Sequence, residues 1–558
     1  MNDINKEYAR WLEFATGDID IVKELREMTE KQKEDAFYRD LEFGTGGLRG
    51  IIGAGTNRIN IYIVAKASQG LSAYIIKKYP DGNRSVAISR DSRIKSDVFA
   101  EIAACVFAAN GIKVYIYPYI SPVPTLSFAT RFLHTSVGVM ITASHNSSEY
   151  NGYKVYGEDG CQITTNAAEE ILSEINAVDI FDEVKTVSLE DGFNSGLIEY
   201  IKPDVLTAFI NEVKNQSLLY NETIDKDVSI VYSPLNGTGL IPITRALNEM
   251  GYTNISVVKE QQFPNGYFPT CPYPNPEEKH ALSLGLEYCK KVDADLLLAT
   301  DPDCDRVGIA VKGSSGDFEL LTGNEVGLLL LEYVCEHRIA NKTMPANPVV
   351  VKTIVTTDLA EKMADNYGCK IVNVLTGFKF IGEQIGVLEK IGREKDYIFG
   401  FEESYGYLSG SYVRDKDGVN GAVLIVEMFA YYKTKGISLI EKLNDIYNKY
   451  GYTINTLHSY KFDGASGFEK MSQIMEMLRH IDSFGEIKIE KVEDYSKGLN
   501  GLPKSNVLKL YLENGCSVVI RPSGTEPKLK LYISVSAKDK KNAVEIESKL
   551  TSNLCNLL

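Results

Sequence analysis

A serine that could act as a nucleophile stands directly after an apolar run. Residues 142–146 read Thr-Ala-Ser-His-Asn and follow the apolar residues 137–141, which predict a buried strand. In open α/β sheets, ligands bind beyond the carboxyl ends of the strands. Ser144 is therefore placed where it could face a ligand. An ordinary strand-ending turn is the alternative, because Ser and Asn side chains stabilise turns by bonding to nearby backbone groups.

Three aspartates alternate along a second loop, between the apolar runs 296–299 and 307–311. In a straight strand Asp301, Asp303 and Asp305 would span ~13 Å at ~3.3 Å per residue. The loop must curl for them to share an ion, and Pro302 favours such a turn. Converging carboxylates repel one another unless a divalent cation lies between them, and Mg²⁺ is preferred when a phosphate adds a ligand. The alternatives are a solvated acidic turn or calcium, but the twelve-residue calcium loop with its terminal Glu is absent.

A third polar loop, residues 400–406, reads Gly-Phe-Glu-Glu-Ser-Tyr-Gly. Residues 376–379 precede it and residues 414–418 follow it. Several donors and acceptors at a strand end can hold sugar hydroxyls in a fixed orientation, and a nearby lysine can move protons. Alternatively, Glu402 and Glu403 face solvent as an isolated acidic pair.

A fourth loop combines basic residues with small polar ones. Residues 521–528 read Arg-Pro-Ser-Gly-Thr-Glu-Pro-Lys. An arginine fork beside hydroxyls and exposed backbone N–H groups forms an anion nest, which indicates a phosphate site. A structural turn would explain the Gly and Pro equally well, but it leaves Arg521 and Lys528 without a role.

The elements that must position these loops alternate between strand and helix. The run 97–110 predicts a helix that Ser96 caps and Gly111 ends, and several strand-like runs are too continuously apolar for a half-solvated strand. This pattern predicts an α/β fold. Near the carboxyl end, residues 507–514, 517–521 and 529–535 predict antiparallel strands before a helix over 542–550, which indicates a smaller α+β module. The other expected strands cover residues 85–89, 113–117, 137–142, 228–232, 255–258, 295–300, 349–355 and 397–401.

Length and composition limit the class of protein. The 558 residues predict about three to five domains. The net charge of −15 repels DNA and anionic lipid, so an anionic substrate needs a local basic pocket. The most apolar stretch, residues 326–335, is too short to cross a membrane, and the first ten residues lack a secretory pattern. The nine cysteines form no CxxC pair. We therefore expect a reduced, cytoplasmic setting and no nucleic-acid or membrane partner.

The four loops in this order resemble those of the α-D-phosphohexomutase superfamily. The resemblance covers nearly the whole chain, and the motifs TASHN, DPDCDR, GFEES and RPSGTEPK follow one another at intervals of domain size. The segments NGYKVY and FGFEESYGYL are similar to the phosphoglucomutase branch, which also includes proteins with phosphopentomutase activity. Two regions depart from the family. Ser147 and Ser148 follow Asn146, where many relatives carry proline, and Tyr405 and Tyr407 stand in the region where some carry histidine.

The resemblance implies a heart-shaped molecule of three related α/β domains and a smaller α+β domain, with the four loops in one cleft. The expected domains are residues 1–205, 206–320, 321–450 and 451–558. Ser144 would be phosphorylated and would bind Mg²⁺ together with Asp301, Asp303 and Asp305. The implied substrate-binding residues are Arg306, Thr376, Gly377, Glu402, Ser404, Arg521, Ser523, Gly524 and Thr525, with Arg49 also lining the cleft.

The implied reaction interconverts glucose 1-phosphate and glucose 6-phosphate through a phosphoserine enzyme and a bisphosphorylated sugar. Glucose 1,6-bisphosphate would serve as activator. Lys154 and His145 would stabilise the moving negative charge, and Lys416 and Lys154 are the candidate general bases. The alternatives are phosphopentomutase or phosphomannomutase activity, a Mg²⁺-dependent sugar phosphatase, and a non-catalytic sugar-phosphate binding protein. We expect a monomer or a homodimer.

Overall fold

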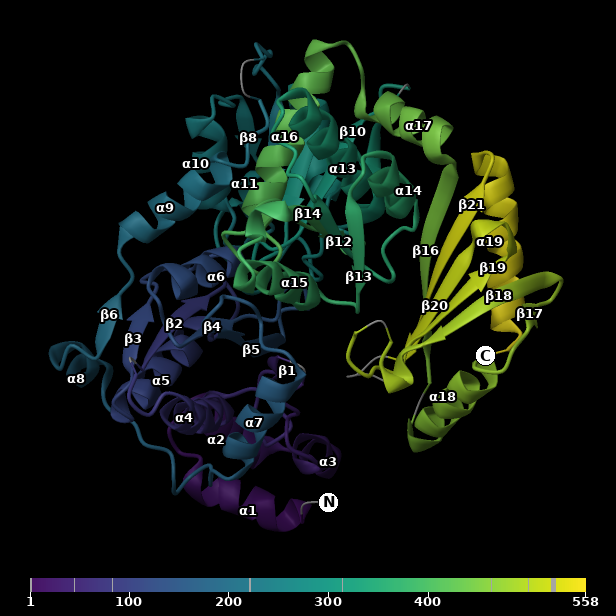
Figure 1. The fold of residues 1–558 in the computed structure, drawn as a ribbon. Helices are drawn as coiled ribbons and strands as arrows, with labels where there is room; N and C mark the ends of the chain where they lie inside the picture. Colours follow the sequence, from purple (N-terminus) through teal and green to yellow (C-terminus); the bar gives the residue numbers. More distant parts are fainter. Residues whose placement is uncertain are drawn as a thin grey trace. The chain divides into compact units, whose positions relative to one another are not determined.

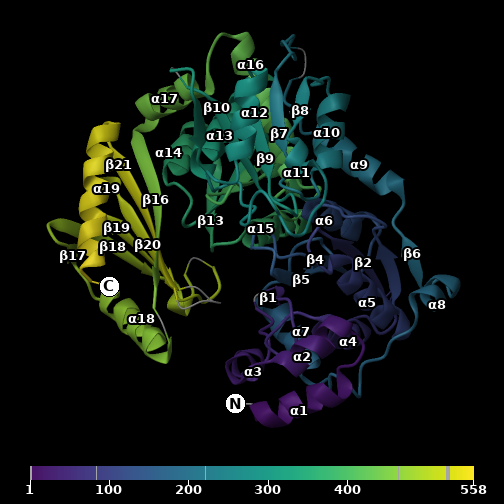
Figure 2. The same cartoon turned by 180° about the vertical axis from the view of Figure 1, so that it is seen from behind.

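The computed structural model describes residues 3–44, 46–82, 84–219, 222–313, 315–462, 464–499, 501–522 and 528–557. The chain forms two compact units, each described here by itself. The first unit contains residues 1–321, 382–394 and 406–430, and the second contains residues 322–381, 395–405 and 431–558. Figures 1 and 2 show the elements of both units from opposite sides.

The first unit begins with a six-stranded mixed sheet. Alternate residues of its strand β2 face opposite layers: Val86 and Ile88 pack with the helix that follows β2, whereas Ala87 packs with Val123 and Leu126 of the next helix. The sheet is therefore covered on both faces, as its continuous apolar runs predict. The strands in spatial order are β1 (Gly47–Ile51), β5 (Tyr150–Gly157), β4 (Val137–Ile141), β2 (Ser85–Arg90), β3 (Lys113–Ile116) and β6 (Ile198–Tyr200).

Helices surround this sheet and precede it. The three amino-terminal helices bury Trp11 and Phe37 in the core of the first sheet. The sequence patterns did not predict these helices. The helices are α1 (Ile4–Phe14), α2 (Ile19–Glu27), α3 (Glu30–Phe37), α4 (Ile61–Lys78), α5 (Ser96–Ala109), α6 (Val123–Phe132), α7 (Thr165–Asn176), α8 (Leu189–Asn194) and α9 (Pro203–Lys214).

The prediction that Ser96 caps α5 is wrong. Lys95, not Ser96, occupies the N-cap position, and Ser96 is already helical. The Ser96 hydroxyl instead donates to Asp91 Oδ1 at 3.0 Å, because a buried tertiary partner takes the hydroxyl that a cap would use. The other end agrees with the prediction, since Gly111 follows the helix with a φ of 71°.

A second, five-stranded sheet completes the folded core of the first unit. Strands β7, β8 and β9 are parallel, and the hairpin β9–β10 and strand β11 add antiparallel pairs. The strands in spatial order are β11 (Phe318–Leu321), β10 (Val307–Lys312), β9 (Leu296–Thr300), β7 (Ile230–Ser233) and β8 (Ile255–Val257), and the helices are α10 (Leu240–Glu249), α11 (Lys259–Gln262) and α12 (Ser283–Val292). The first unit also holds β15 (Gly406–Leu408).

The second unit combines a parallel and an antiparallel sheet. The parallel strands are β13 (Lys370–Val374), β12 (Val349–Thr353) and β14 (Tyr397–Glu402), with helices α13 (Gly323–Ala340), α14 (Leu359–Asn366) and α17 (Leu439–Tyr450). The antiparallel strands, in spatial order, are β16 (Tyr452–Lys461), β21 (Lys528–Ala537), β20 (Ser517–Pro522), β19 (Leu508–Leu512), β18 (Ile487–Asp494) and β17 (Ser483–Phe484). Helices α15 (Phe378–Lys390) and α16 (Gly418–Thr434) have residues in both units.

The carboxyl-terminal sheet confirms the predicted change of architecture. Its strands β16, β21, β20, β19 and β18 pair antiparallel, and helix α19 (Lys540–Cys555) packs on β16 and β21 (Figure 1). Helix α18 (Gly464–Leu478) adds Met471 and Leu478 to the same core. The fold class, α/β with a carboxyl-terminal α+β module, is thus confirmed, whereas the domain boundaries stay a prediction. Within the described residues, none of the helices has the length and apolar character needed to cross a membrane.

A close helix contact gives a test of this packing. A Cβ atom on Gly70 of α4 would lie 2.5 Å from the Cα of Ile175 in α7, so Gly70→Ala must force the two helices apart. Overpacking of this kind costs about 1–3 kcal/mol and exceeds the ~1 kcal/mol that Ala gains over Gly in a helix. We expect a lower midpoint of thermal unfolding. The control is Gly386→Ala in α15, where the nearest atom is 3.7 Å away; equal midpoints for the two variants would contradict the account.

Candidate metal and phosphoserine centre

Ser144 lies on a tight turn at the carboxyl end of β4. Its φ of 54° is in the left-handed region, which is uncommon for a residue with a side chain. Its backbone N–H donates to Thr142 Oγ1 at 2.8 Å. Thr142 Oγ1 in turn lies 2.6 Å from Asp91 Oδ2 and 3.2 Å from Asp303 Oδ2. The strained turn is therefore fixed by side chains from both sheets of the first unit.

A buried arginine, Arg93, binds the backbone of the same loop. Its guanidinium donates to the carbonyls of Ser144 at 2.6 Å, Ser147 at 2.8 Å and Tyr150 at 2.9 Å, and also to that of Asn146. Sequence reasoning missed Arg93. The available signal was its position just after β2, because β2 and β4 are parallel neighbours and their carboxyl ends lie at one edge of the sheet.

The Ser144 hydroxyl points toward the second sheet. Its Oγ lies 2.9 Å from Asp301 Oδ2 and 3.1 Å from His145 Nδ1. Burial and the cations of Arg306 and Arg49 hold the pKa of His145 well below its ordinary value. The imidazole is therefore neutral near pH 7. The structure thus brings the first two predicted loops, separated by more than 150 residues, into one cluster.

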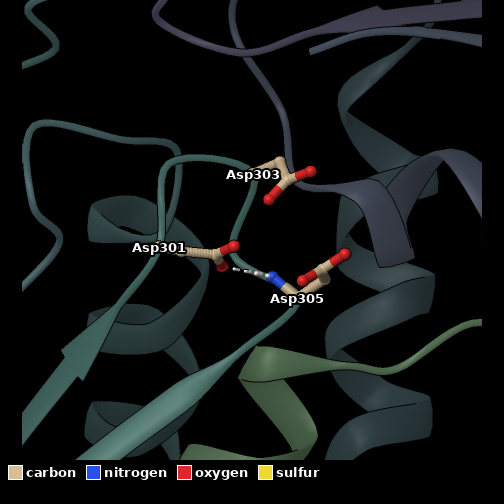
Figure 3. Close-up of side chains that lie close together, drawn as sticks. All are labelled: Asp301, Asp303 and Asp305. Carbon is tan, nitrogen blue, oxygen red and sulfur yellow. Dashed lines mark hydrogen bonds between the residues drawn. The ribbon is translucent and has the colours of Figure 1, made fainter. Parts of the chain in front are cut away.

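The three aspartates converge. Ligand oxygens of Asp301, Asp303 and Asp305 lie within 4.8 Å of one another, and all three residues are buried. The turn forms because Asp301 Oδ1 accepts from the backbone N–H of Asp305 at 3.1 Å and of Arg306 at 3.0 Å. Cys304 takes a left-handed φ of 52°. Figure 3 shows the three carboxylates around one small space.

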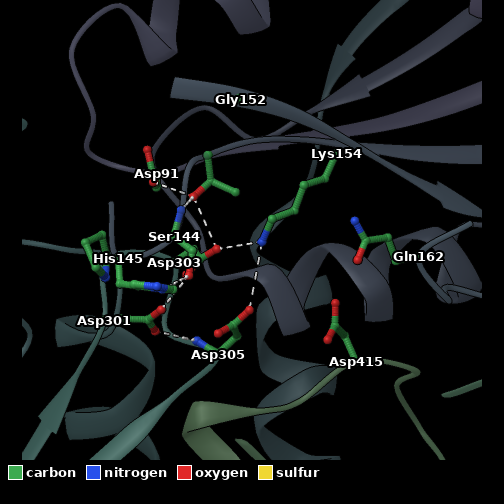
Figure 4. Close-up of polar contacts among 12 residues, drawn as sticks. Asp91, Ser144, His145, Gly152, Lys154, Gln162, Asp301, Asp303, Asp305 and Asp415 are labelled. Atoms are coloured by element: carbon green, nitrogen blue, oxygen red, sulfur yellow. Dashed lines mark hydrogen bonds and ion pairs between the residues drawn. The ribbon is translucent and has the colours of Figure 1, made fainter. Parts of the chain in front are cut away.

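Two lysines from separate elements approach these carboxylates. Lys154 Nζ on β5 lies 2.9 Å from Asp303 (Figure 4). Lys416 Nζ lies 2.8 Å from Asp305. Arg306 Nε is more distant, 3.9 Å from both Asp301 and Asp305. Even so, burial and the charge of Asp303 raise the pKa of Asp305 to about 6. Without a further cation, the cluster resists the ionisation of all three acids.

The residues present fit a divalent cation. Asp303 Oδ1 and Asp305 Oδ1 are buried, and within the part of the chain that the structure describes they have no hydrogen-bond partner. A bound ion would satisfy both oxygens and neutralise the excess negative charge. An all-oxygen set of hard ligands suits Mg²⁺.

The position of Lys416 depends on the residues beside it. Asp415 accepts from Tyr156 Oη at 2.9 Å and from the backbone N–H of Lys416 at 2.8 Å. The buried Arg414 pairs with Glu389 at 2.7 Å. The segment that carries Lys416 is thus tied to the first sheet through β5. Arg49, on the neighbouring β1, donates to Asn146 Oδ1 at 3.2 Å and so joins the serine loop.

The remaining predicted site residues lie in the second unit. Glu402 ends β14 and is 4% exposed, and Ser404 follows in the turn. Thr376 and Gly377 lie between β13 and α15, where Gly377 has a φ of 117°. Arg521 is in β20 opposite Lys530 of β21. Ser523, Gly524 and Thr525 lie outside the described residues.

With this geometry established, the family of the chain follows from comparison with known proteins. Four family models match in order: "Phosphoglucomutase/phosphomannomutase, alpha/beta/alpha domain I" at residues 40–180, domain II at 207–316, domain III at 322–450, and the C-terminal domain at 477–548. The chain belongs to the phosphoglucomutase/phosphomannomutase family, within the α-D-phosphohexomutase superfamily.

Individual relatives agree with this assignment. The chain is 36% identical over 563 residues to a phosphoglucomutase of Staphylococcus saprophyticus, covering 98% of this chain and 99% of the relative. The crystal structure of the Paramecium phosphoglucomutase parafusin matches the fold with a TM-score of 0.69 at 17% identity, covering 92% and 95% of the two chains. An Aspergillus fumigatus N-acetylphosphoglucosamine mutase, solved with GlcNAc-6P and magnesium, matches with a TM-score of 0.52 at 12% identity over 100% and 99%.

The metal site can be tested without turnover. Asp303→Asn and Asp305→Asn each remove one of the converging charges, so we expect Mg²⁺ affinity, measured by isothermal titration calorimetry, to fall about tenfold or more. Glu277→Gln is the matched control, because Glu277 pairs with Arg306 beside the cluster but is not one of the three acids. Unchanged Mg²⁺ affinity in both aspartate variants would contradict the assignment.

Proposed function

We propose that this protein is a phosphoglucomutase that interconverts glucose 1-phosphate and glucose 6-phosphate through a phosphorylated Ser144. The observation that carries the proposal is the 2.9 Å contact of the Ser144 hydroxyl with one of three buried aspartates. A nucleophilic hydroxyl beside a divalent-cation site suits phosphoryl transfer, where positioning and charge neutralisation do most of the catalytic work. The Staphylococcus saprophyticus relative that carries this name, aligned over 99% of its length, supports the choice.

In the proposed reaction, phospho-Ser144 donates its phosphoryl group to the free hydroxyl of a monophosphorylated sugar. The bond from phosphorus to Ser144 Oγ breaks and a bond to the sugar oxygen forms. The proton of the sugar hydroxyl passes to a base, which returns it to Ser144 Oγ. Lys416 and Lys154 are the candidate bases, each only as the neutral amine; the one that is not the base stays a cation. Lys154 and His145 would stabilise the transferred group. The resulting bisphosphate then returns its other phosphoryl group to Ser144, so that the enzyme is regenerated.

Mg²⁺, held by Asp301, Asp303 and Asp305 and by an oxygen of phospho-Ser144, would polarise the phosphoryl group when bound. We assign sugar hydroxyls to Glu402 and Ser404, with Thr376 and Gly377 beside them. We assign the distal phosphate to Arg521, Ser523, Gly524 and Thr525. Arg306 and Arg49 would supply further positive charge. Glucose 1,6-bisphosphate would act as activator by phosphorylating Ser144. A cytoplasmic location and a monomeric or dimeric state remain part of the same proposal.

Replacement of the nucleophile tests the mechanism most simply. Ser144→Ala should reduce turnover by about a thousandfold or more and remove one covalent phosphoryl group from the intact-protein mass, because alanine lacks the oxygen that would carry the phosphoryl group. Ser147→Ala is the matched control, since the Ser147 side chain contacts Glu149 and not the aspartates. Retained activity in Ser144→Ala would refute the proposal, and inorganic phosphate released at the rate of turnover would indicate a phosphatase instead.

Substrate choice is tested by comparing kcat/KM for glucose 1-phosphate, mannose 1-phosphate and ribose 1-phosphate. The ratio of these constants reports differential binding of the transition states. We expect glucose 1-phosphate to give the highest value. A higher value for the mannose or the pentose substrate would keep the mechanism but change the assigned activity.

A further inference from the structure

One short turn of the second unit contacts every described segment there that carries a proposed substrate residue. It comprises residues 354–358, between β12 and α14. Thr356 and Thr357 are 2% and 0% exposed. A polar turn that is buried this completely is held by specific partners, because unpaired buried polar groups are costly.

The first partner is the sugar loop. The hydroxyls of Thr353, the last residue of β12, and of Thr356 both lie 3.2 Å from Glu403 Oε2. The two hydroxyls are also 2.8 Å from each other. Glu403 stands between Glu402 and Ser404, the two residues assigned to sugar hydroxyls. The turn therefore fixes the backbone from which those two side chains project.

The second partner is the segment that leads to Thr376 and Gly377. The backbone N–H of Ile354 donates to the carbonyl of Val374, the last residue of β13, at 2.8 Å. The backbone N–H of Thr357 donates to Asn324 Oδ1 at 2.9 Å. These bonds attach the turn to β13 and to the start of α13.

The third partner is the antiparallel sheet that carries Arg521. Asp358 accepts from Lys509 Nζ of β19 at 2.7 Å and from Ser517 Oγ of β20 at 2.8 Å. Lys509 Nζ also donates to the carbonyl of Ile354 at 3.2 Å. Ser517 begins the strand in which Arg521 lies. Asp358 thus links the turn to the proposed phosphate-binding strand.

Two buried lysines make the negative charge of Asp358 important where the turn meets the antiparallel sheet. Lys352 and Lys509 are 0% and 2% exposed, and both ammonium groups contact Asp358 Oδ1, at 3.3 and 2.7 Å. Burial raises the pKa of Asp358, but the two lysines outweigh it and hold the value at about 2. Asp358 is thus ionised at neutral pH and partly neutralises two buried cations, which would otherwise repel each other.

We propose that the turn at residues 354–358 couples the sugar loop to the phosphate-binding strand. The positioning residues are Glu403 of the sugar loop, on the sugar side of the turn, and Asp358, the last residue of the turn, on its phosphate side. This inference rests on the proposed function, which assigns substrate contacts to Glu402, Ser404 and Arg521. Neither positioning residue needs to touch substrate. Each holds one binding segment against the same rigid turn, so that a sugar phosphate meets both segments at a fixed separation.

The phosphate end is tested with Asp358→Asn. This variant keeps an acceptor but leaves the two lysines without their carboxylate, so we expect KM for glucose 1-phosphate to rise about tenfold while kcat changes less than threefold. Ser517→Ala is the milder second variant, in case Asp358→Asn folds poorly, and should raise KM in the same direction. Glu361→Gln is the matched control. Glu361 also contacts Lys352, at 3.2 Å, but its other partner is Asn373 of β13. It should retain normal KM.

The sugar end is tested with Glu403→Ala and Glu403→Gln. Glutamine keeps an oxygen that can accept from the two threonine hydroxyls, so it should restore most of the discrimination between glucose and mannose 1-phosphates that alanine loses. A merely structural residue would not show this rescue in the specificity ratio. The melting temperature of each variant reports folding separately.

Coupling itself is measured by the double variant Asp358→Asn with Glu403→Ala. If the turn joins the two ends, the loss in kcat/KM is smaller than the product of the two single losses, because either change already frees the turn. Purely multiplicative losses, or a KM effect in Glu361→Gln as large as in Asp358→Asn, would overturn the inference. These outcomes leave the mutase mechanism intact, whereas retained turnover in Ser144→Ala would refute the mechanism itself.

Discussion

The site depends on three carboxylates that are buried within 4.8 Å of one another. Their mutual repulsion is only partly offset by Lys154 and Lys416, and burial raises the pKa of Asp305 to about 6. The strongly apolar hairpin β9–β10 stabilises the loop despite this cost. Such an arrangement is compatible with full ionisation when a divalent cation completes the charge balance. The Ser144 hydroxyl lies beside that position, and this contact is the basis of the role that we propose for the serine.

The rest of the first unit serves to hold two loops together. Strands β2 and β4 end at one edge of the first sheet, where Asp91 and Arg93 hold the loop from which Ser144 contacts Asp301. Arg93 fixes four carbonyls of the serine loop, and Thr142 lies between carboxylates of both sheets. In the second unit, the turn at residues 354–358 likewise joins the sugar loop to the strand that carries Arg521. In both units, buried charged side chains set the position of residues assigned to the chemistry.

Local features of the sequence predicted much of this arrangement. The α/β alternation and the antiparallel carboxyl-terminal sheet follow from apolar periodicity. The curling of the aspartate loop follows from Pro302 and from the expectation that the three carboxylates share a cation. Contacts across long sequence separations did not follow from local pattern. Arg93 and the pair of Asp358 with Lys509 carry no motif, and Ser96 has the side chain of a helix cap but bonds to Asp91 instead. The amino-terminal helices, which bury Trp11, were also missed because their contribution is tertiary packing.

The central claim is that Ser144 and the three aspartates share one Mg²⁺. It is tested most directly by measuring the Kd for Mg²⁺ of the protein with Ser144 phosphorylated and with Ser144 free. A phosphate oxygen adds an anionic ligand, so the account predicts tighter Mg²⁺ binding by the phosphorylated protein, with the difference abolished in Asp303→Asn. Equal affinities for the two forms of the wild-type protein would contradict it.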